Sequence, residues 1–171
     1  DHKEGEWMAR DYQPIGTSLQ SEFISEEEVK ASIHKMLNEL FHTGTWNRLI
    51  LKGNLKTEIE CRSIVVSQNF EADVAGPNPV LTLWMKLWPY LHEQKVEVRI
   101  QSYEVFADYP LWFEIVTLGV SNLMEIHIQG GIKKKIKECI QELVQQKITN
   151  SGMDATASQI SLRPHKIEIL S

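Results

Sequence analysis

The stretch from Leu123 to Ile148 constrains the fold more than any other part of the chain, because its hydrophobic period changes across a pair of glycines. Before Gly130-Gly131, apolar side chains occupy every second position, which is typical of a strand with one solvent-facing side. After the glycines, the apolar positions follow helical spacing from about Ile132 to Ile148. The pattern predicts a strand followed directly by an amphipathic helix.

Two further helices are predicted upstream. Ser25 and Glu28 fit a capping box at the start of the first, and Gly44 is expected to end it. Its predicted buried face is Val29, Ile33, Leu37, Leu40 and Phe41. Asn78-Pro79 fit the start of another helix, which we expect from Val80 until Pro89 bends or ends it near Trp88. The predicted buried face of this second helix includes Trp84 and Trp88.

The remaining apolar segments predict strands. These segments are Arg48–Leu51, Thr57–Val66, Val96–Ile100, Leu111–Leu118, Met124–Ile128, Ile160–Leu162 and Ile167–Leu170. Gly53-Asn54 fits a tight turn between the first two, and other neighbours are also joined by short turns. We therefore predict an α+β fold, in the order α-β-β-α-β-β-β-α-β, with a mixed or mostly antiparallel sheet and about three helices packed on it. Residues 1–24 are expected to form an extended N-terminal arm, and residues 25–171 a single α+β domain.

The composition argues against several classes of function. The formal net charge of −5 argues against a general polyanion binder, although a local basic patch remains compatible with it. The longest nearly apolar run, Val80 to Leu91, is too short to span a bilayer. The chain has two cysteines, Cys61 and Cys139, without a spaced Cys/His framework. We expect both to be buried thiols in an intracellular protein, with no metal site.

Motifs for catalysis are missing from the sequence. It contains no nucleophile elbow, phosphate-binding loop, dinucleotide fingerprint or His-Glu-x-x-His motif. Glu125 and His127 share a strand face, where a solvated pair is expected because no nucleophile or substrate pocket can be located beside them. The sequence therefore predicts a protein that is not an enzyme and that has no catalytic residues and no cofactor.

A lysine cluster marks the start of the predicted third helix. A helix N-terminus carries about half a positive charge, so lysines there are unfavourable unless an anion binds beside them. A phosphate, a nucleic-acid backbone or an acidic segment would relieve the conflict. The candidate anion-binding residues are Gly130, Gly131, Lys133, Lys134 and Lys137. The alternative is a solvated helix end, with Lys134 balanced by Glu138 one turn later.

The same strand–Gly-Gly–helix segment is superficially similar to the last strand and last helix of KH-type RNA-binding domains. That family holds nucleic acid with a Gly-x-x-Gly loop between two earlier helices. No such loop occurs upstream of Leu123. The resemblance covers this segment alone, without the loop with which the family holds nucleic acid.

Aromatic residues are dense between Trp84 and Phe113. Trp112 and Phe113 are adjacent on a predicted strand and must point to opposite faces. One of them can pack under the helices, and the other needs cover from a second layer, from the N-terminal arm or from another chain. The candidate partner-binding residues are Trp7, Ile15, Trp112 and Phe113.

The sequence thus favours a non-catalytic interaction domain of a larger intracellular protein. Binding to another protein, or self-association, is the first expectation. The alternative is binding of RNA or another polyanion through the lysine-rich end of the third helix. A third class, an apolar-ligand carrier, would need a cavity between the sheet and the second helix.

Overall fold

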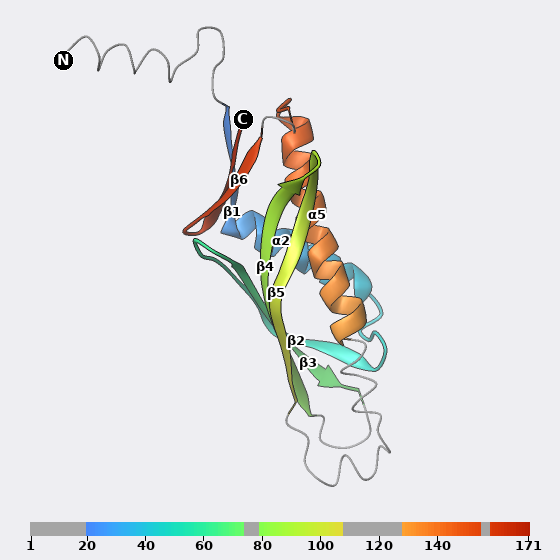
Figure 1. Cartoon of the computed structure of the whole chain (residues 1–171). Coiled ribbons are helices and arrows are strands. Elements are labelled where there is room, and N and C mark those ends of the chain that lie inside the picture. Colours follow the sequence, from blue (N-terminus) through green and yellow to red (C-terminus); the bar gives the residue numbers. More distant parts are fainter. Residues whose placement is uncertain (1–19, 74–78, 108–127, 155–157) are drawn as a thin grey trace, which may run out of the picture.

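The computed structural model describes residues 20–73, 79–107, 128–154 and 158–171, which form two helices and two antiparallel sheets (Figure 1). The elements are β1 Ser21–Ser25, α2 Glu26–Leu40, β2 Leu49–Ile59, β3 Ile64–Ala72, β4 Val80–His92, β5 Lys95–Ala107, the π-helical turn η1 Ile128–Ile132, α5 Lys133–Asn150, β6 Gln159–Arg163 and β7 Lys166–Leu170. The α+β class is confirmed. The described part has two helices rather than the predicted three.

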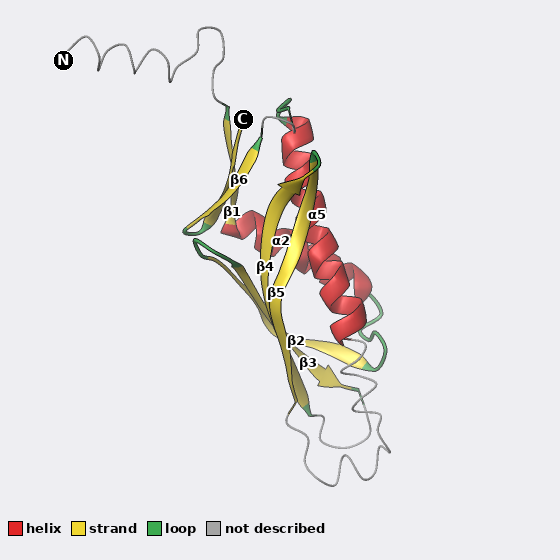
Figure 2. Cartoon of the chain, viewed as in Figure 1, coloured by secondary structure: helices red, strands yellow, loops and turns green. Residues whose placement is uncertain are grey.

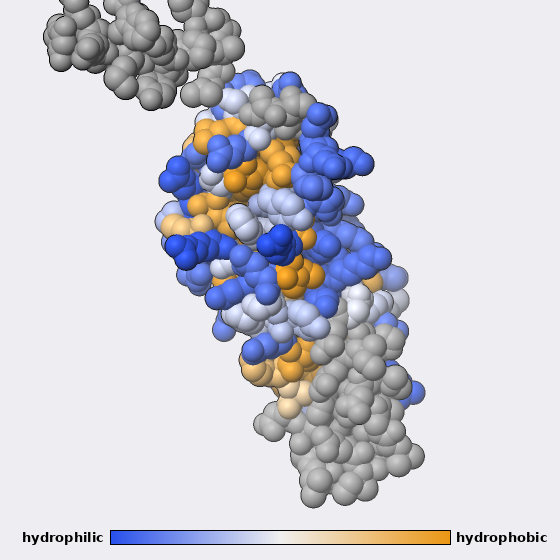
Figure 3. Space-filling view, in the orientation of Figure 1, coloured by the Kyte–Doolittle hydropathy of each residue, from blue (hydrophilic) through white to orange (hydrophobic). Residues whose placement is uncertain are grey.

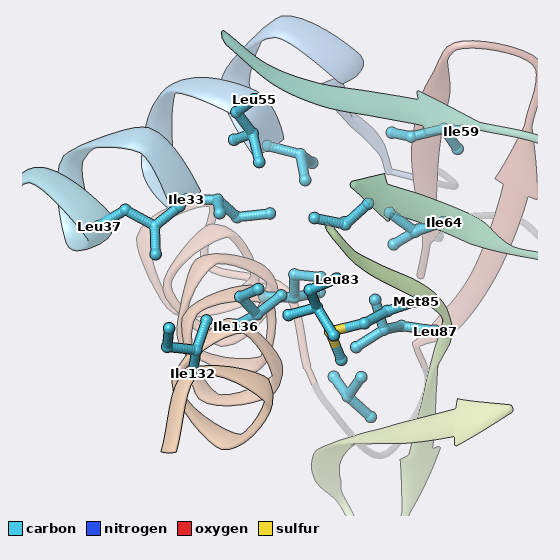
Figure 4. Packing of buried hydrophobic residues seen from close by; sticks show 14 of the residues in the cluster. Ile33, Leu37, Leu55, Ile59, Ile64, Leu83, Met85, Leu87, Ile132 and Ile136 are labelled. Carbon is cyan, nitrogen blue, oxygen red and sulfur yellow. The ribbon is translucent and has the colours of Figure 1, made fainter. Parts of the chain in front are cut away.

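The larger sheet is a meander in the order β2-β3-β4-β5, and the smaller has the order β1-β7-β6. Helices α2 and α5 contact each other and pack on the larger sheet (Figure 2). Buried side chains from both helices and both sheets form one cluster, part of which Figure 4 shows between α2, α5 and the larger sheet. None of the described helices is both long enough and apolar enough to cross a membrane.

Helix α2 begins as the sequence predicts. The amide of Glu28 donates to the Ser25 hydroxyl over 3.1 Å, and the amide of Ser25 donates to the Glu28 carboxylate over 2.9 Å. This capping box satisfies two amide groups that a helix start leaves unpaired. The helix ends at Leu40, before Gly44 turns the chain with a φ of 90°.

Helix α5 confirms the predicted third helix. Its buried residues follow one face: Ile136, Ile140, Val144 and Ile148. The turn η1 precedes it without a break, so Ile128, expected at the end of a strand, is already helical. Beside this face, Gln141 donates to the carbonyl of Val96 over 2.8 Å. The helix therefore also covers one end of the edge strand β5.

The predicted second helix is wrong, because Val80–His92 is the strand β4. Its buried residues are Leu81, Leu83, Met85, Leu87 and Pro89, which alternate along the strand. Residues four apart share a face in a helix and also in a strand, so the spacing of Trp84 and Trp88 fits both. Pro89 is tolerated because it lies beyond Leu87, the last β4 residue that pairs with β3.

The turn predicted at Gly53-Asn54 is also wrong. Both residues lie inside β2, where the pairing with β3 shifts register between Lys52 and Lys56. The buried Gln68 amide fills this bulge and donates to the carbonyls of Lys52, at 3.1 Å, and Gly53, at 3.4 Å. Extra residues in one strand can be accommodated when a side chain replaces the lost ladder bonds.

The β2–β3 hairpin instead turns at residues 60–63, and Cys61 at its tip is exposed. The prediction of a buried thiol is therefore wrong for Cys61, while Cys139 is half-buried. The two short C-terminal strands are confirmed as β6 and β7. The predicted strand Leu111–Leu118 and most of Met124–Ile128 lie outside the described residues, as does most of the arm, whose last residues contribute to β1.

Candidate interaction surface

The outer face is the side of the larger sheet that points away from the buried cluster. Its side chains alternate with the buried ones on each strand, so the strand register assigns them. The outer face includes Lys52, Lys56, Glu58, Glu71, Thr82, Trp84, Lys86, Trp88, Tyr90, Glu97, Arg99, Glu104 and Phe106. No described helix packs on it.

Aromatic side chains follow β4 along the outer face. Trp84 lies where β4 has a strand on each side, and Trp88 and Tyr90 lie beyond Leu87, where β4 pairs with β5 alone. Trp88 is 41% exposed, and its ring centroid lies 6.4 Å from that of Tyr90. Phe106, on β5, is 55% exposed. Figure 3, in the same view as Figure 1, shows hydrophobic patches on the surface separated by hydrophilic residues.

Two cations of the outer face lie against these rings. The Lys86 ammonium is 5.4 Å from the Trp84 ring centroid, and the Arg99 guanidinium is 5.7 Å from that of Tyr90. Such contacts contribute roughly 0.5–1 kcal/mol at exposed sites and hold both partners in place. Each contact therefore restrains one ring and one cation of the outer face.

The charges of the outer face balance. It carries four cations, Lys52, Lys56, Lys86 and Arg99, and four carboxylates, Glu58, Glu71, Glu97 and Glu104. Lys52 and Glu71 form an ion pair of 2.7 Å. A nucleic-acid backbone is bound mainly through an excess of positive charge, and this face has none.

The lysine cluster lies at the start of α5. Lys133 Nζ sits 3.6 Å from the Tyr103 ring centroid, and Lys134 Nζ is 3.9 Å from the Glu138 carboxylate. Lys134 is exposed, whereas Lys137 is half-buried. The helical backbone already begins in η1, so the lysines lie about one turn after the N-terminal end of the helical segment and not at that end.

The two glycines beside the cluster have different surroundings. Open space lies next to Gly130, whereas a Cβ on Gly131 would lie 2.5 Å from the outer ring carbon of Trp46. Gly131 is thus required where η1 passes over an indole ring. This packing explains one of the two glycines without an anion.

The structure brings the five candidate anion-binding residues together on η1 and the first turns of α5. The other candidates, Trp7, Ile15, Trp112 and Phe113, lie outside the described residues. The sequence prediction placed Trp84 and Trp88 on the buried face of a helix and so missed their position on the outer face of the sheet. The alternation of the leucines and Met85 on the same segment is the signal that would have found it.

The surroundings of the half-buried Cys139 favour its protonated form. Burial raises the pKa of the Cys139 thiol, and the nearby Glu142 carboxylate adds to this, which outweighs the opposing effect of the Ser32 hydroxyl 3.2 Å away. A thiol with a raised pKa stays protonated and unreactive near neutral pH. Among the described residues, no three His, Cys, Asp or Glu side chains are grouped so that they could hold a metal ion.

The chain matches no protein-family model and no curated protein sequence.

Proposed function

We propose that this chain is a non-catalytic interaction domain that binds another protein through the outer face of its larger sheet. The observation that carries the proposal is the row of Trp84, Trp88 and Tyr90 on a central strand, bordered by balanced charges. Protein interfaces typically have an aromatic centre and a polar rim, and tryptophan and tyrosine are enriched among their strongest contacts.

The size of the outer face suits this role. Strand β4 has 13 residues. The four strands overlap along Val80–Leu87, and β4 pairs with β5 alone beyond Leu87. At about 3.3 Å per residue and about 4.8 Å between strands, this outline covers roughly 450–650 Å². One side of a stable protein–protein interface buries about 800 Å². The charge balance favours a partner surface that also presents both signs at its rim, rather than a polyanion.

The proposal is tested by placing a photo-crosslinking phenylalanine derivative at Trp88 in the full chain. The matched control carries it at Lys35, which is exposed on α2. We expect one partner protein to be crosslinked from position 88 and not from position 35. The purified partner should then bind the wild-type chain, and Trp88→Ala with Tyr90→Ala should weaken this binding at least about tenfold. Equal crosslinking from both positions, or binding unaffected by the double substitution, contradicts the proposal.

A second candidate function is binding of RNA or another polyanion at the start of α5. It is favoured by one observation, the exposed Tyr103 ring that lies beside Lys133 in a segment with three further lysines. Aromatic rings and cations together bind single-stranded nucleic acid by stacking and by phosphate contact.

Fluorescence anisotropy with a labelled single-stranded RNA separates the two functions. Phosphate contacts predict affinity that falls linearly with salt on logarithmic axes. Lys134→Glu should weaken binding and reduce that slope, whereas Lys147→Glu, at the other end of α5, should change little. Binding that Trp88→Ala removes and Lys134→Glu does not would assign RNA to the outer face instead, and no binding at low salt would eliminate this candidate.

A further inference from the structure

A closed ring of hydrogen bonds joins three segments that are distant in the sequence. Glu26, at the start of α2, donates its backbone N–H to the carbonyl of His165 in the β6–β7 turn, and His165 donates its own N–H to the carbonyl of Ile59 at the end of β2, both over 2.9 Å. Ile59 completes the ring, because its N–H donates to the Glu26 carboxylate over 2.9 Å. We call this ring the latch.

The His165 side chain closes the latch a second time. Its Nδ1 lies 2.9 Å from the same Glu26 carboxylate oxygen that accepts from Ile59. Figure 1 shows the consequence for the fold, since the tip of the β6–β7 hairpin lies beside the tip of the β2–β3 hairpin. The latch therefore ties the smaller sheet to the larger one and to α2.

The latch holds a backbone conformation that is unfavourable by itself. His165 has a φ of 64°, in the left-handed region that residues with a side chain seldom adopt. Two strands joined by Pro164-His165 alone need this positive φ at the second turn residue. The turn between Arg163 and Lys166 sets this φ, and the bonds to Glu26 and Ile59 hold the turn against α2 and β2.

The other charged groups of the same hairpin have contacts of their own, whereas the imidazole of His165 contacts Glu26. On the hairpin itself, Arg163 pairs with Glu168 at 3.8 Å, and the Lys166 ammonium lies 4.4 Å from the Phe23 ring centroid. Glu58 of β2 adds negative charge near His165, and Lys30 of α2 adds positive charge near Glu26. The surroundings of the imidazole are therefore mainly anionic.

We propose that Glu26, Ile59 and His165 form a proton-dependent latch, which is tightest when the imidazole is protonated and which loosens when that proton is lost. Protonation makes the contact to Glu26 a charge-assisted hydrogen bond, the stronger class. When the neutral ring carries its hydrogen on the other nitrogen, Nδ1 cannot donate at all. Release of the latch loosens the tip of a hairpin whose side chains Leu162 and Ile167 belong to the core and whose strand β7 stays paired with β1.

The directions in which the pKa values of His165 and Glu26 are shifted determine the pH range over which the latch is tight. The hydrogen bond and charge of Glu26 raise the pKa of His165 above its ordinary 6.5. The stabilisation from protonated His165 is thus complete below 6.5 and is lost as pH rises through the raised value. Burial raises the pKa of Glu26, but the Ile59 amide and His165 lower it more, so that it lies below 4.5 and the carboxylate is lost only in acid. The latch is therefore tightest between about 4.5 and 6.5.

Native-state hydrogen exchange of the full chain tests this inference. Protection of the Ile59 and His165 amides, corrected for the intrinsic exchange rate at each pH, should fall several-fold between pH 6 and pH 8.5. The Val144 amide, in the middle of α5, should keep its protection, because opening at the latch is local. Equal protection of the latch amides at both pH values overturns the proposal.

His165→Asn and Glu26→Gln separate the latch from general effects of pH. Asparagine tolerates the left-handed conformation and does not titrate, so His165→Asn should fold and should lose the pH dependence at Ile59. Glutamine keeps an acceptor for Ile59 but no charge, so the pKa of His165, followed by the NMR shift of its ring protons, should fall toward 6.5. A His165→Asn chain that retains the wild-type pH dependence, or a Glu26→Gln chain with an unchanged His165 titration, refutes the latch.

Discussion

Gly130 and Gly131 are adjacent in the sequence, but only Gly131 lies where a side chain would clash with a neighbour. Alanine at either position would favour the helical turn η1 through its better helix propensity. At Gly130 nothing opposes that gain, whereas at Gly131 the new methyl group would meet the ring of Trp46 at 2.5 Å. Trp46 is itself held edge-on against the buried Phe41, at 6.1 Å between ring centroids, so it cannot move freely.

We therefore predict opposite effects from two otherwise identical substitutions. Gly131→Ala should lower the free energy of unfolding by about 1–3 kcal/mol, the usual range for overpacking. Gly130→Ala should leave it unchanged or raise it by up to about 1 kcal/mol. Urea denaturation followed by tryptophan fluorescence measures both. If Gly131→Ala were neutral while Gly130→Ala destabilised the protein, the packing of η1 on Trp46 would be wrong.

Elements whose signals are local could be predicted from the sequence. The capping box at Ser25 lies within four residues, and the stripe from Ile136 to Ile148 repeats on a single helix face, so both were predicted correctly. Strand β4 was not predicted, because residues four apart lie on the same face in a helix and in a strand. Only pairing with β3 and β5 distinguishes the two structures. The bulge at Gly53 depends on Gln68 from another strand, and no local pattern reveals it.

The candidate interaction surface was hidden for the same reason. Trp84 and Trp88 lie outside the core only if the segment is a strand, because Leu83 and Leu87 then occupy its buried side. The position of the lysine cluster at the start of α5 was predictable, because it depends on one helix. Its contact with Tyr103 was not, because it joins α5 to a different strand.

Strand β4 gives a sharp test of its own face assignment. Leu87 is fully buried, and the adjacent Lys86 lies on the outer face. Leu87→Asp places an unpaired charge in the core and should destabilise the protein by more than about 4 kcal/mol, or prevent folding. Lys86→Asp should cost less than about 1 kcal/mol, mainly through its lost contact with the Trp84 ring. Thermal melting by circular dichroism measures both, and a similar loss in the two variants would contradict the assigned faces.

Helix α5 allows the same comparison on the other layer. Ile136→Asp should destabilise the protein as severely as Leu87→Asp, because Ile136 is fully buried against the sheet. The exposed neighbour Lys135 provides the control, and Lys135→Asp should melt close to the wild type. Near-normal melting of Ile136→Asp would show that a different face of α5 packs inward.

At the scale of the molecule, the two sheets share a single core although no strand pairs across them. Ile24, Leu162, Ile167 and Ile169 of the smaller sheet belong to the same buried cluster as the side chains of the larger sheet. A cluster without a break predicts one cooperative unfolding transition rather than separate melting of each sheet. The tryptophans among the described residues, Trp46, Trp84 and Trp88, all lie outside the smaller sheet and report on the remainder.

Ile167→Ala tests this cooperativity because it removes buried volume from the smaller sheet alone. We expect a loss of about 2–5 kcal/mol, seen as the same shift in tryptophan fluorescence and in far-ultraviolet circular dichroism. Gln159→Ala, exposed on the neighbouring strand β6, is the matched control and should shift neither signal. If circular dichroism revealed an early transition while fluorescence stayed unchanged, the smaller sheet would be an independent unit. Its attachment would then depend on the latch at His165 rather than on the shared core, and raising the pH would separate the two transitions further.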